Sequence, residues 1–220
     1  QWDIVCPACA TPCAHKGTYE MKPLYPTSIY AITKRDHEEM FLVTGRSYKI
    51  PTVALRYFNI FGPRQALSNP YTGVAAIFSS RFLNRKSPVI YEDGLQSRDF
   101  VHVSDIVQAN ILAMEKPEAD YEAFNVGTGR NITVRHVAEV LRQKIIGDDS
   151  IPIQIEHKFR EGDIRHCYAD ISKIQSRLGY KPGVRFEDGM EELTAWVSRQ
   201  SARDGFEDAR RELEKRGLAN

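Results

Sequence analysis

The chain has 220 residues, of which 42 % are hydrophobic, and 30 Lys and Arg stand against 29 Asp and Glu. This length and apolar content indicate one large domain or two smaller ones and exclude intrinsic disorder. The balanced charge argues against nucleic acid or an anionic membrane surface as a partner. No run of about 20 apolar residues predicts a membrane span. With four unevenly placed cysteines and no signal segment, the sequence favours a cytoplasmic protein over a secreted disulfide framework.

Prolines interrupt residues 1–27, which therefore predict a loop. This loop carries Cys6 and Cys9 in a CxxC spacing, and Cys13 follows. A CxxC pair supplies half of the four ligands of a tetrahedral zinc site, but the chain has no second CxxC. The preferred interpretation is ordinary reduced cysteines in a surface loop. No metal is predicted; the candidate ligands are Cys6 and Cys9, and Cys13 and His15 could in principle complete a site, although their spacing from Cys9 is tight.

Helical and strand patterns alternate from residue 28 onward. Thr27 and Ser28 can cap a helix over 29–44 that ends at Gly45, and Pro51 opens a buried strand that runs to Phe58. The other predicted elements, in chain order, are a helix over 74–86, strands over 89–91 and 98–103, a helix over 104–116 capped by Ser104, a strand over 124–126, a helix to about 146 capped by Thr133, an exposed strand over 151–156, and helices over 171–178, 186–199 and 206–216. This alternation predicts an α/β architecture.

Tyr30 and Lys34 place a phenol and an ammonium on one face of the first predicted helix. An ammonium beside a tyrosine favours the phenolate, which can take a proton from a sugar hydroxyl or return it. With ten tyrosines in the chain, a YxxxK spacing also arises by chance on an ordinary helix surface. The buried strand that follows favours the functional interpretation, because active sites lie at the carboxyl ends of parallel strands.

Two patterns bear on phosphate binding. No GxGxxG is present, and the glycines of residues 127–129 are interpreted as a strand-to-helix turn, so a phosphate cradle for NAD is not predicted. Arginines do stand in loops or directly after strand-like runs, in residues 59–64, at Arg98, and at Arg160 close to Asp163. Guanidinium groups at such places suit a diphosphate, which they bind through forked donors.

Taken together, these motifs resemble a known family. The resemblance covers most of the chain from Lys22 to Arg199 and is carried by residues 30–34, 54–65, 98–106, 124–127, 162–165 and 169–170. Their order and spacing are similar to those of the extended short-chain dehydrogenase/reductases that act on nucleotide sugars, which include UDP-glucose 4-epimerases and dTDP-glucose dehydratases. The cysteine loop and the charged C-terminal helix look most like the dTDP-L-rhamnose 4-epimerase branch.

The resemblance implies a fold and a division of the chain into four segments. The chain would be the C-terminal part of a Rossmann-like enzyme with its smaller substrate-binding domain, without the N-terminal NAD-binding strands. Residues 1–27 would form the cysteine-containing loop and 28–65 the end of the Rossmann domain. Residues 66–200 would form mainly the substrate-binding region with returning Rossmann elements, and 201–220 a charged helix.

The resemblance also implies roles at the cofactor. Tyr30 would be the acid and base at the sugar hydroxyl, and Lys34 would hold the nicotinamide ribose of NAD. Tyr57 and Phe58 would lie beside the nicotinamide. Because the glycine-rich NAD loop and the catalytic Ser or Thr of the family are absent, this chain alone is expected to bind NAD poorly and to be inactive.

The implied ligand is a nucleotide diphosphate-sugar. The implied substrate-binding residues are Asn59, Asn69, Val89, Tyr91, Arg98, Arg160 and Asp163. Asn59, Arg98 and Arg160 would contact the diphosphate, while Val89 and Tyr91 would line the base. The predicted function is that of the substrate-binding portion of a homodimeric, NAD-dependent 4-epimerase. The alternatives are a 4,6-dehydratase or reductase of the same family, or a non-catalytic sugar-nucleotide-binding or zinc-knuckle module.

Overall fold

The computed structural model describes residues 3–67, 73–158, 162–200 and 206–215. Its helices are α1 (Ile29–Tyr48), α2 (Val74–Leu83), α3 (Val103–Glu115), the 3-10 turn η1 (Pro117–Ala119), α4 (Val134–Ile145), α5 (Ser172–Leu178), α6 (Phe186–Val197) and α7 (Phe206–Lys215). Its strands are β1 (Ala54–Tyr57), β2 (Asn59–Phe61), β3 (Val89–Ile90), β4 (Ser97–Arg98), β5 (Phe100–His102), β6 (Ala123–Val126), β7 (Ile132–Thr133), β8 (Gln154–Ile155) and β9 (His166–Cys167).

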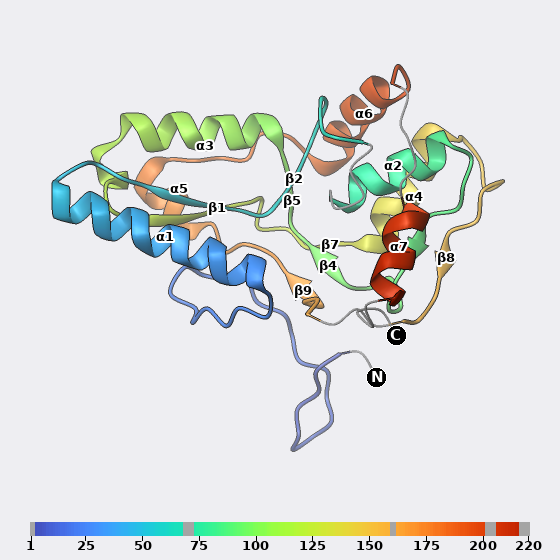
Figure 1. Ribbon diagram of the computed structural model, residues 1–220, viewed down its shortest axis with the longest axis horizontal. Helices are drawn as coiled ribbons and strands as arrows, with labels where there is room; N and C mark the ends of the chain where they lie inside the picture. Colours follow the sequence, from blue (N-terminus) through green and yellow to red (C-terminus); the bar gives the residue numbers. More distant parts are fainter. Residues whose placement is uncertain (1–2, 68–72, 159–161, 201–205, 216–220) are drawn as a thin grey trace.

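The strands pair mainly in parallel. β1 pairs with β6, β2 with β5 and β3 with β8, all in parallel, while β4 lies between antiparallel β7 and parallel β9. In Figure 1, α1 and α3 run along either side of β1. Parallel pairing joined by helical crossovers is the predicted α/β architecture, which is confirmed.

Two predicted strands differ from the observed ones. Of the strand predicted over 51–58 only β1 forms, and β2 follows after Phe58, beyond the predicted range; the strand predicted over 98–103 is β4 followed by β5, with Asp99 between them. The reason is an exchange of partners: β1 pairs with β6, whereas β2 pairs with β5, and the Asn59 N–H donates to the Asp99 carbonyl (2.9 Å). All three residues of β5 are buried.

The first helix begins as predicted but does not end as predicted. The Ser28 hydroxyl accepts a hydrogen bond from the Ala31 N–H (3.1 Å) and caps α1. The helix continues past Gly45 to Tyr48 and is capped by Lys49, which takes the left-handed conformation (φ 56°) that usually favours glycine. A Cβ at Gly45 would collide with Thr52, so this glycine permits close packing of the helix on the chain that enters β1.

The start of α3 differs from the prediction, whereas the start of α4 agrees with it. The cap of α3 is His102, whose Nδ1 accepts from the Ser104 N–H (3.4 Å), rather than Ser104 itself. The cap of α4 is Thr133, as predicted. Strands β7 and β9 were not predicted, because two residues are too few to show a period.

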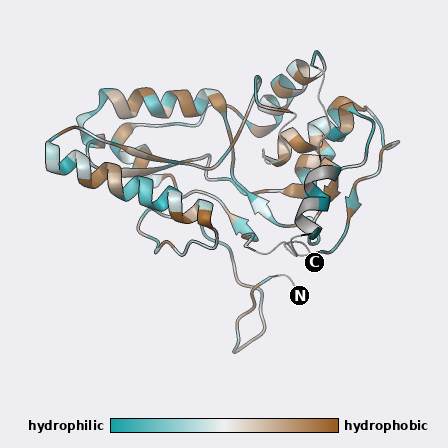
Figure 2. Cartoon of the chain, viewed as in Figure 1, coloured by the Kyte–Doolittle hydropathy of each residue, from teal (hydrophilic) through white to brown (hydrophobic). Residues whose placement is uncertain are grey.

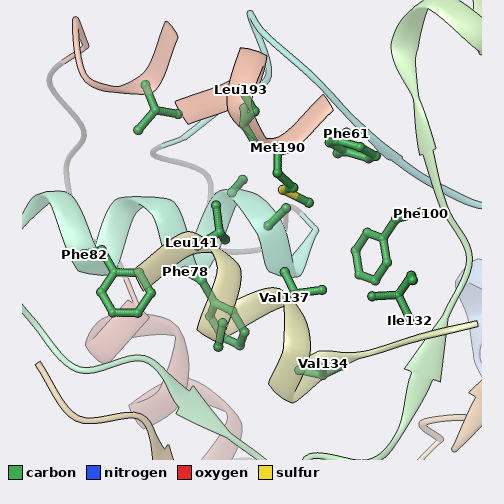
Figure 3. Close-up of a cluster of buried hydrophobic side chains, with 14 of the residues drawn as sticks. Phe61, Phe78, Phe82, Phe100, Ile132, Val134, Val137, Leu141, Met190 and Leu193 are labelled. Carbon is green, nitrogen blue, oxygen red and sulfur yellow. The ribbon is translucent and has the colours of Figure 1, made fainter. Parts of the chain in front are cut away.

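Two hydrophobic cores hold the chain together. The first fills the space between α2, α4, α6 and β5, and Figure 3 shows its larger side chains, including Phe61, Phe78, Phe82, Phe100, Leu141, Met190 and Leu193. The second lies around β6, α3 and α5, and includes Val101, Phe124, Val126, Ile174, Leu178 and Tyr180. Among the described residues, no helix is both long enough and apolar enough to cross a membrane.

Candidate functional site

Tyr30 and Lys34 lie in the first turns of α1 and face solvent together. The side chain of Tyr30 is 70 % exposed, Lys34 is also exposed, and the Lys34 Nζ lies 5.6 Å from the centre of the Tyr30 ring. The spacing therefore produces the expected pair on one helix face, open to a ligand.

The helix that carries this pair is fixed to the sheet by Arg56 of β1. Its guanidinium binds both carboxylate oxygens of Glu38 (2.7 and 2.6 Å) and also donates to the Glu20 carbonyl (2.9 Å). These hydrogen bonds to Glu38 raise the pKa of Arg56 in spite of its burial. At the other end of α1, Arg46 donates to the Tyr121 carbonyl (2.7 Å). The position of Tyr30 is thus set by a helix anchored at two points.

A late loop reaches the start of α1 (Figure 1). The Thr27 hydroxyl donates to the carbonyl of Gly162 (3.2 Å), 135 residues further along the chain. The same loop meets Arg98, whose Nη1 donates to the carbonyls of Ser97 and Arg165 (both 2.9 Å). The other guanidinium nitrogens of Arg98 have no hydrogen-bond partner among the described residues. Arg98 and the start of α1 therefore both contact the loop that carries Asp163.

The residues predicted beside the nicotinamide differ in exposure. Tyr57 is 43 % exposed, and its hydroxyl donates to Asn110 Oδ1 of α3 (3.0 Å). Phe58 is partly buried and packs against the second core. Tyr57 therefore has an open side chain, whereas Phe58 also has a packing role, and their contact with a cofactor stays a prediction.

The predicted substrate-binding residues are only partly described. Asn59 is half-buried in β2, Val89 is buried in β3, and Tyr91 is half-buried with its carbonyl accepting from the Gln96 side chain (2.9 Å). Asp163 is exposed. Asn69 and Arg160 lie outside the described residues. Their roles stay predictions.

A buried carboxylate occupies the glycine turn that the sequence analysis considered for phosphate. Asp99 is fully buried; its Oδ1 accepts from the N–H and hydroxyl of Thr128 (2.8 and 2.6 Å), and its Oδ2 accepts from the N–H groups of Gly129 and Ala169 (2.9 and 3.1 Å). Gly127 has no room for a side chain against Asp99. The turn, which leads from β6 to β7, binds a carboxylate of the chain itself. Asp99, grouped with Arg98 in the sequence, is thus a structural residue.

A cluster of charged side chains, which the sequence did not reveal, is centred on Arg165. Its guanidinium binds Asp3 (2.6 Å) of the N-terminal segment and Glu92 (2.6 Å) and Asp93 (2.9 Å), which follow one another after β3. Burial acts to lower the pKa of Arg165, but these hydrogen bonds outweigh it and raise the pKa. Since the Arg165 carbonyl accepts from Arg98, the cluster also holds the loop that meets Arg98 in place.

The Arg165 cluster predicts a response to acid. Hydrogen bonds from Arg165 and His166 lower the pKa of Asp3 to about 2 from an ordinary 3.8. Because the folded-state pKa is the lower one, the stabilisation is complete above about pH 4 and is lost as the pH falls towards 2. We expect protection against amide hydrogen exchange, measured relative to the unfolded chain at the same pH, to fall across residues 3–18 over this range before it falls in α4. Asp3→Asn should show the lower protection already at neutral pH, and wild-type protection of residues 3–18 that does not change between pH 5 and 2 would contradict the assignment.

A cavity of about 810 Å³ opens elsewhere, between residues 60–65 and α6. Its walls include Arg64, Glu192 and Trp196, whereas Tyr30 and Arg98 do not line it. The cavity is therefore separate from the predicted cofactor and substrate residues.

Several known proteins are similar to this chain. Residues 13–193 match the family model described as GDP-mannose 4,6 dehydratase. A dTDP-L-rhamnose 4-epimerase of Burkholderia thailandensis is 32 % identical over 175 residues, which are 80 % of this chain and 47 % of the relative. A UDP-glucose 4-epimerase structure from Thermotoga maritima, with UDP-glucose, has a TM-score of 0.76 and 36 % identity and covers 85 % of this chain and 59 % of its own.

A further structure shows the same likeness. The UDP-N-acetylglucosamine 4-epimerase of Methanobrevibacter ruminantium M1, in complex with UDP-N-acetylmuramic acid, has a TM-score of 0.75 and 38 % identity, and the match covers 82 % of this chain and 57 % of that one. The chain spans about half the length of the relatives it matches. The family model covers most of the chain, and the solved relatives share its fold. The chain therefore belongs to the GDP-mannose 4,6-dehydratase family of extended short-chain dehydrogenases, whose members include nucleotide-sugar epimerases and dehydratases.

Proposed function

We propose that this chain forms the sugar-nucleotide-binding part, with the acid/base pair, of an NAD-dependent nucleotide-sugar 4-epimerase. The observation that carries the proposal is the exposed pair of Tyr30 and Lys34 on an anchored helix, with Arg98 and the loop of Asp163 at the start of that helix. Relatives named as 4-epimerases of UDP- and dTDP-sugars support this choice of reaction.

The described residues fit one end of NAD. Tyr30 is exposed, and the Lys34 ammonium lies beside its ring on the same helix face. Both side chains could therefore contact the nicotinamide end of NAD, including its ribose hydroxyls. The pyrophosphate end has no such partner among the described residues, because the glycine turn at 127–129 is already occupied by Asp99. When bound, NAD supplies a hydride acceptor and donor for carbon 4 of the sugar.

The residues of this chain would act on the proton and on the diphosphate. Tyr30 takes the proton of the C4 hydroxyl while the C4 hydride is removed, which leaves a 4-keto sugar. Lys34, whose Nζ lies 5.6 Å from the centre of the Tyr30 ring, would hold the nicotinamide ribose. Once the keto sugar has turned over, Tyr30 would give back the proton as bound NAD returned the hydride to the opposite face, so that C4 would be inverted. Arg98 holds the diphosphate through its remaining guanidinium nitrogens.

A 4,6-dehydratase is the second candidate, favoured by the description of the matching family model. Both reactions begin with oxidation at C4, so Tyr30, Lys34 and Arg98 would have the same tasks. The products separate the two: an epimerase returns a hexose with inverted C4, whereas a dehydratase releases water and leaves a 4-keto-6-deoxy sugar.

We further propose a cytoplasmic homodimer that uses the outer face of α1. Met40, Phe41 and Val43 of this helix are each more than half exposed, and apolar colouring recurs along α1 in Figure 2. Exposed apolar residues gathered on one helix are typical of a subunit interface. The four cysteines are free thiols, as a reducing compartment would keep them.

The proposed diphosphate site predicts a loss of affinity on Arg98→Ala. A charge-assisted hydrogen bond contributes on the order of 1.5–3 kcal/mol, so UDP or dTDP should bind roughly ten- to a hundredfold more weakly. Isothermal titration of the chain with UDP-glucose measures this directly. Arg98→Lys should recover only part of the affinity, because lysine lacks the forked donors.

Arg135→Ala is the matched control, since Arg135 lies on α4 and pairs only with Glu139 one turn away among the described residues. It should bind UDP-glucose like the wild type. Thermal unfolding of the Arg98 variants shows whether the lost contacts to the Ser97 and Arg165 carbonyls disturb the fold. Unchanged affinity in a folded Arg98→Ala variant would refute the diphosphate assignment.

A further inference from the structure

Two histidines and an aspartate meet where the N-terminal hairpin (residues 4–13) joins the fold beside β9 (Figure 1). Asp3 precedes the hairpin, His15 follows it, and His166 begins β9. The rings of His15 and His166 stack with their centroids 3.7 Å apart, and Asp3 Oδ1 lies 3.1 Å from Nε2 of His166. One nitrogen of each histidine and one carboxylate oxygen of Asp3 all lie within 4.8 Å of one another. Three potential metal ligands thus converge from distant parts of the chain.

His15 is brought to this place by hydrogen bonds that leave its imidazole free. The Tyr168 hydroxyl donates to the His15 carbonyl (2.8 Å), the Thr18 N–H donates to the Tyr168 carbonyl (2.7 Å), and the Asp170 N–H donates to the Thr18 carbonyl (2.8 Å). The ring nitrogens of His15 have no hydrogen-bond partner within the described part of the chain, and the residue is exposed. The backbone at His15 is therefore fixed, while its ring is able to turn towards a ligand.

His166 and Asp3 are each oriented by a further side chain. Nδ1 of His166 lies 2.8 Å from the Ser97 hydroxyl, which is buried in the neighbouring strand β4. Histidines that bind a metal through one ring nitrogen usually donate the other ring N–H to a nearby oxygen, as His166 can do to Ser97. Asp3 Oδ1 accepts from Arg165 Nε (2.6 Å), whereas Oδ2 accepts no hydrogen bond from the residues described. Nε2 of His166 and Oδ2 of Asp3 are thus directed donors.

The charges around these donors favour a cation. Arg165 is the guanidinium beside the site, and it is bound by three carboxylates, those of Asp3, Glu92 and Asp93. This group therefore carries an excess of negative charge, which a divalent cation next to Asp3 would reduce.

The donor set and its spacing suit zinc. Two imidazoles and a carboxylate are common ligands of Zn²⁺, whereas Mg²⁺ and Ca²⁺ prefer oxygen ligands alone. Zinc bonds of about 2 Å place tetrahedral ligand atoms about 3.3 Å apart. Rotation of the exposed His15 ring out of its stack on His166 brings the three donors from within 4.8 Å to that spacing.

We propose that Asp3, His15 and His166 bind one Zn²⁺ ion, with water in the fourth position. The ion ties both ends of the N-terminal hairpin to β9. Because β9 pairs with β4, the same ion braces the strand that carries Arg98. The sequence offered His15 only as a partner of the cysteines, since no spacing rule links it to residue 3 or to β9. The site does not depend on the proposed sugar-nucleotide function.

The test is calorimetric titration of the tag-free, reduced, metal-free chain with Zn²⁺. The wild type should bind about one Zn²⁺ per chain. His15→Ala removes one ligand but keeps the carbonyl that Tyr168 binds, so it should abolish the binding without loss of the fold. Ser97→Ala should weaken binding about 10- to 100-fold, the usual effect of removing a partner of a ligand histidine. His37→Ala, an exposed histidine of α1, is the matched control and should bind like the wild type.

Two measurements separate this site from the thiols of the hairpin. Cys6→Ser/Cys9→Ser should bind Zn²⁺ like the wild type. One equivalent of Co²⁺ should give visible d–d bands without thiolate charge-transfer absorption, because the ligands are nitrogen and oxygen. Zn²⁺ should also raise the protection of residues 3–18 against amide hydrogen exchange in the wild type but not in His15→Ala.

The proposal would be overturned by a folded wild type that binds no Zn²⁺, or by wild-type affinity in His15→Ala. Loss of binding in Cys6→Ser/Cys9→Ser, or thiolate absorption with Co²⁺, would overturn it as well, since either would assign the metal to the cysteines. Circular dichroism establishes that each variant is folded, and neither hydrophobic core includes a residue of this site.

Discussion

Tyr30→Phe is expected to lower kcat by about 10²- to 10⁴-fold, the usual effect of removing an acid/base group. The phenyl ring keeps the shape of the side chain but cannot take or return the proton of the C4 hydroxyl. The assay requires an NAD-binding half, which a chimera can supply by joining the N-terminal half of the Thermotoga maritima epimerase to this chain. Turnover of UDP-glucose and dTDP-sugars is then followed by product analysis.

Tyr48→Phe is the matched control, because Tyr48 lies at the other end of α1 and is similarly exposed at 74 %. It should leave kcat unchanged. Affinity for the sugar nucleotide should be nearly the same in both variants, because the Tyr30 hydroxyl is needed for proton transfer and not for binding. An unchanged kcat in Tyr30→Phe would mean that the YxxxK spacing is an ordinary helix surface.

Asp99→Ala is expected to lower the free energy of unfolding by roughly 3 kcal/mol or more, because hydrogen bonds to a buried charged group are strong and their donors would be left unpaired. Three backbone N–H groups, of Thr128, Gly129 and Ala169, and the Thr128 hydroxyl would lose their acceptor. Urea unfolding with linear extrapolation measures the change.

Two further variants at acidic positions sharpen this test. Asp99→Asn keeps the shape of the side chain but turns an amide N–H₂ towards N–H donors, so its loss should be smaller than that of alanine but still measurable. Asp163→Ala removes an exposed carboxylate and should change stability by less than about 0.5 kcal/mol. Equal stability of Asp99→Ala and wild type would contradict the role of Asp99 in holding β4, β6 and the chain after β9 together.

Local sequence patterns predicted the features that depend on neighbouring residues. The capped start of α1 at Ser28, the cap of α4 at Thr133 and the Tyr30–Lys34 face all arise within one or two turns of helix. The α/β class followed from the alternation of these elements. The resemblance to nucleotide-sugar epimerases, confirmed by the family match, came from the order of motifs along the chain.

Contacts between distant segments were not predictable in the same way. Asp99 meets Thr128 and Ala169, and Arg165 meets Asp3 and Glu92, over separations that no periodic pattern records. The change of strand partner on either side of Phe58 likewise depends on where β5 and β6 lie. Such features need the fold before they can be recognised.

The central claim, that this chain binds the nucleotide diphosphate-sugar, is tested most directly by calorimetry on the wild-type chain. Titration with UDP-glucose, dTDP-glucose and NAD should give saturable binding at about one sugar nucleotide per chain, and for NAD a Kd well above about 1 μM. Circular dichroism of the same sample establishes that the chain is folded. A folded chain that binds neither sugar nucleotide, or that binds NAD at micromolar Kd in their place, would contradict the account.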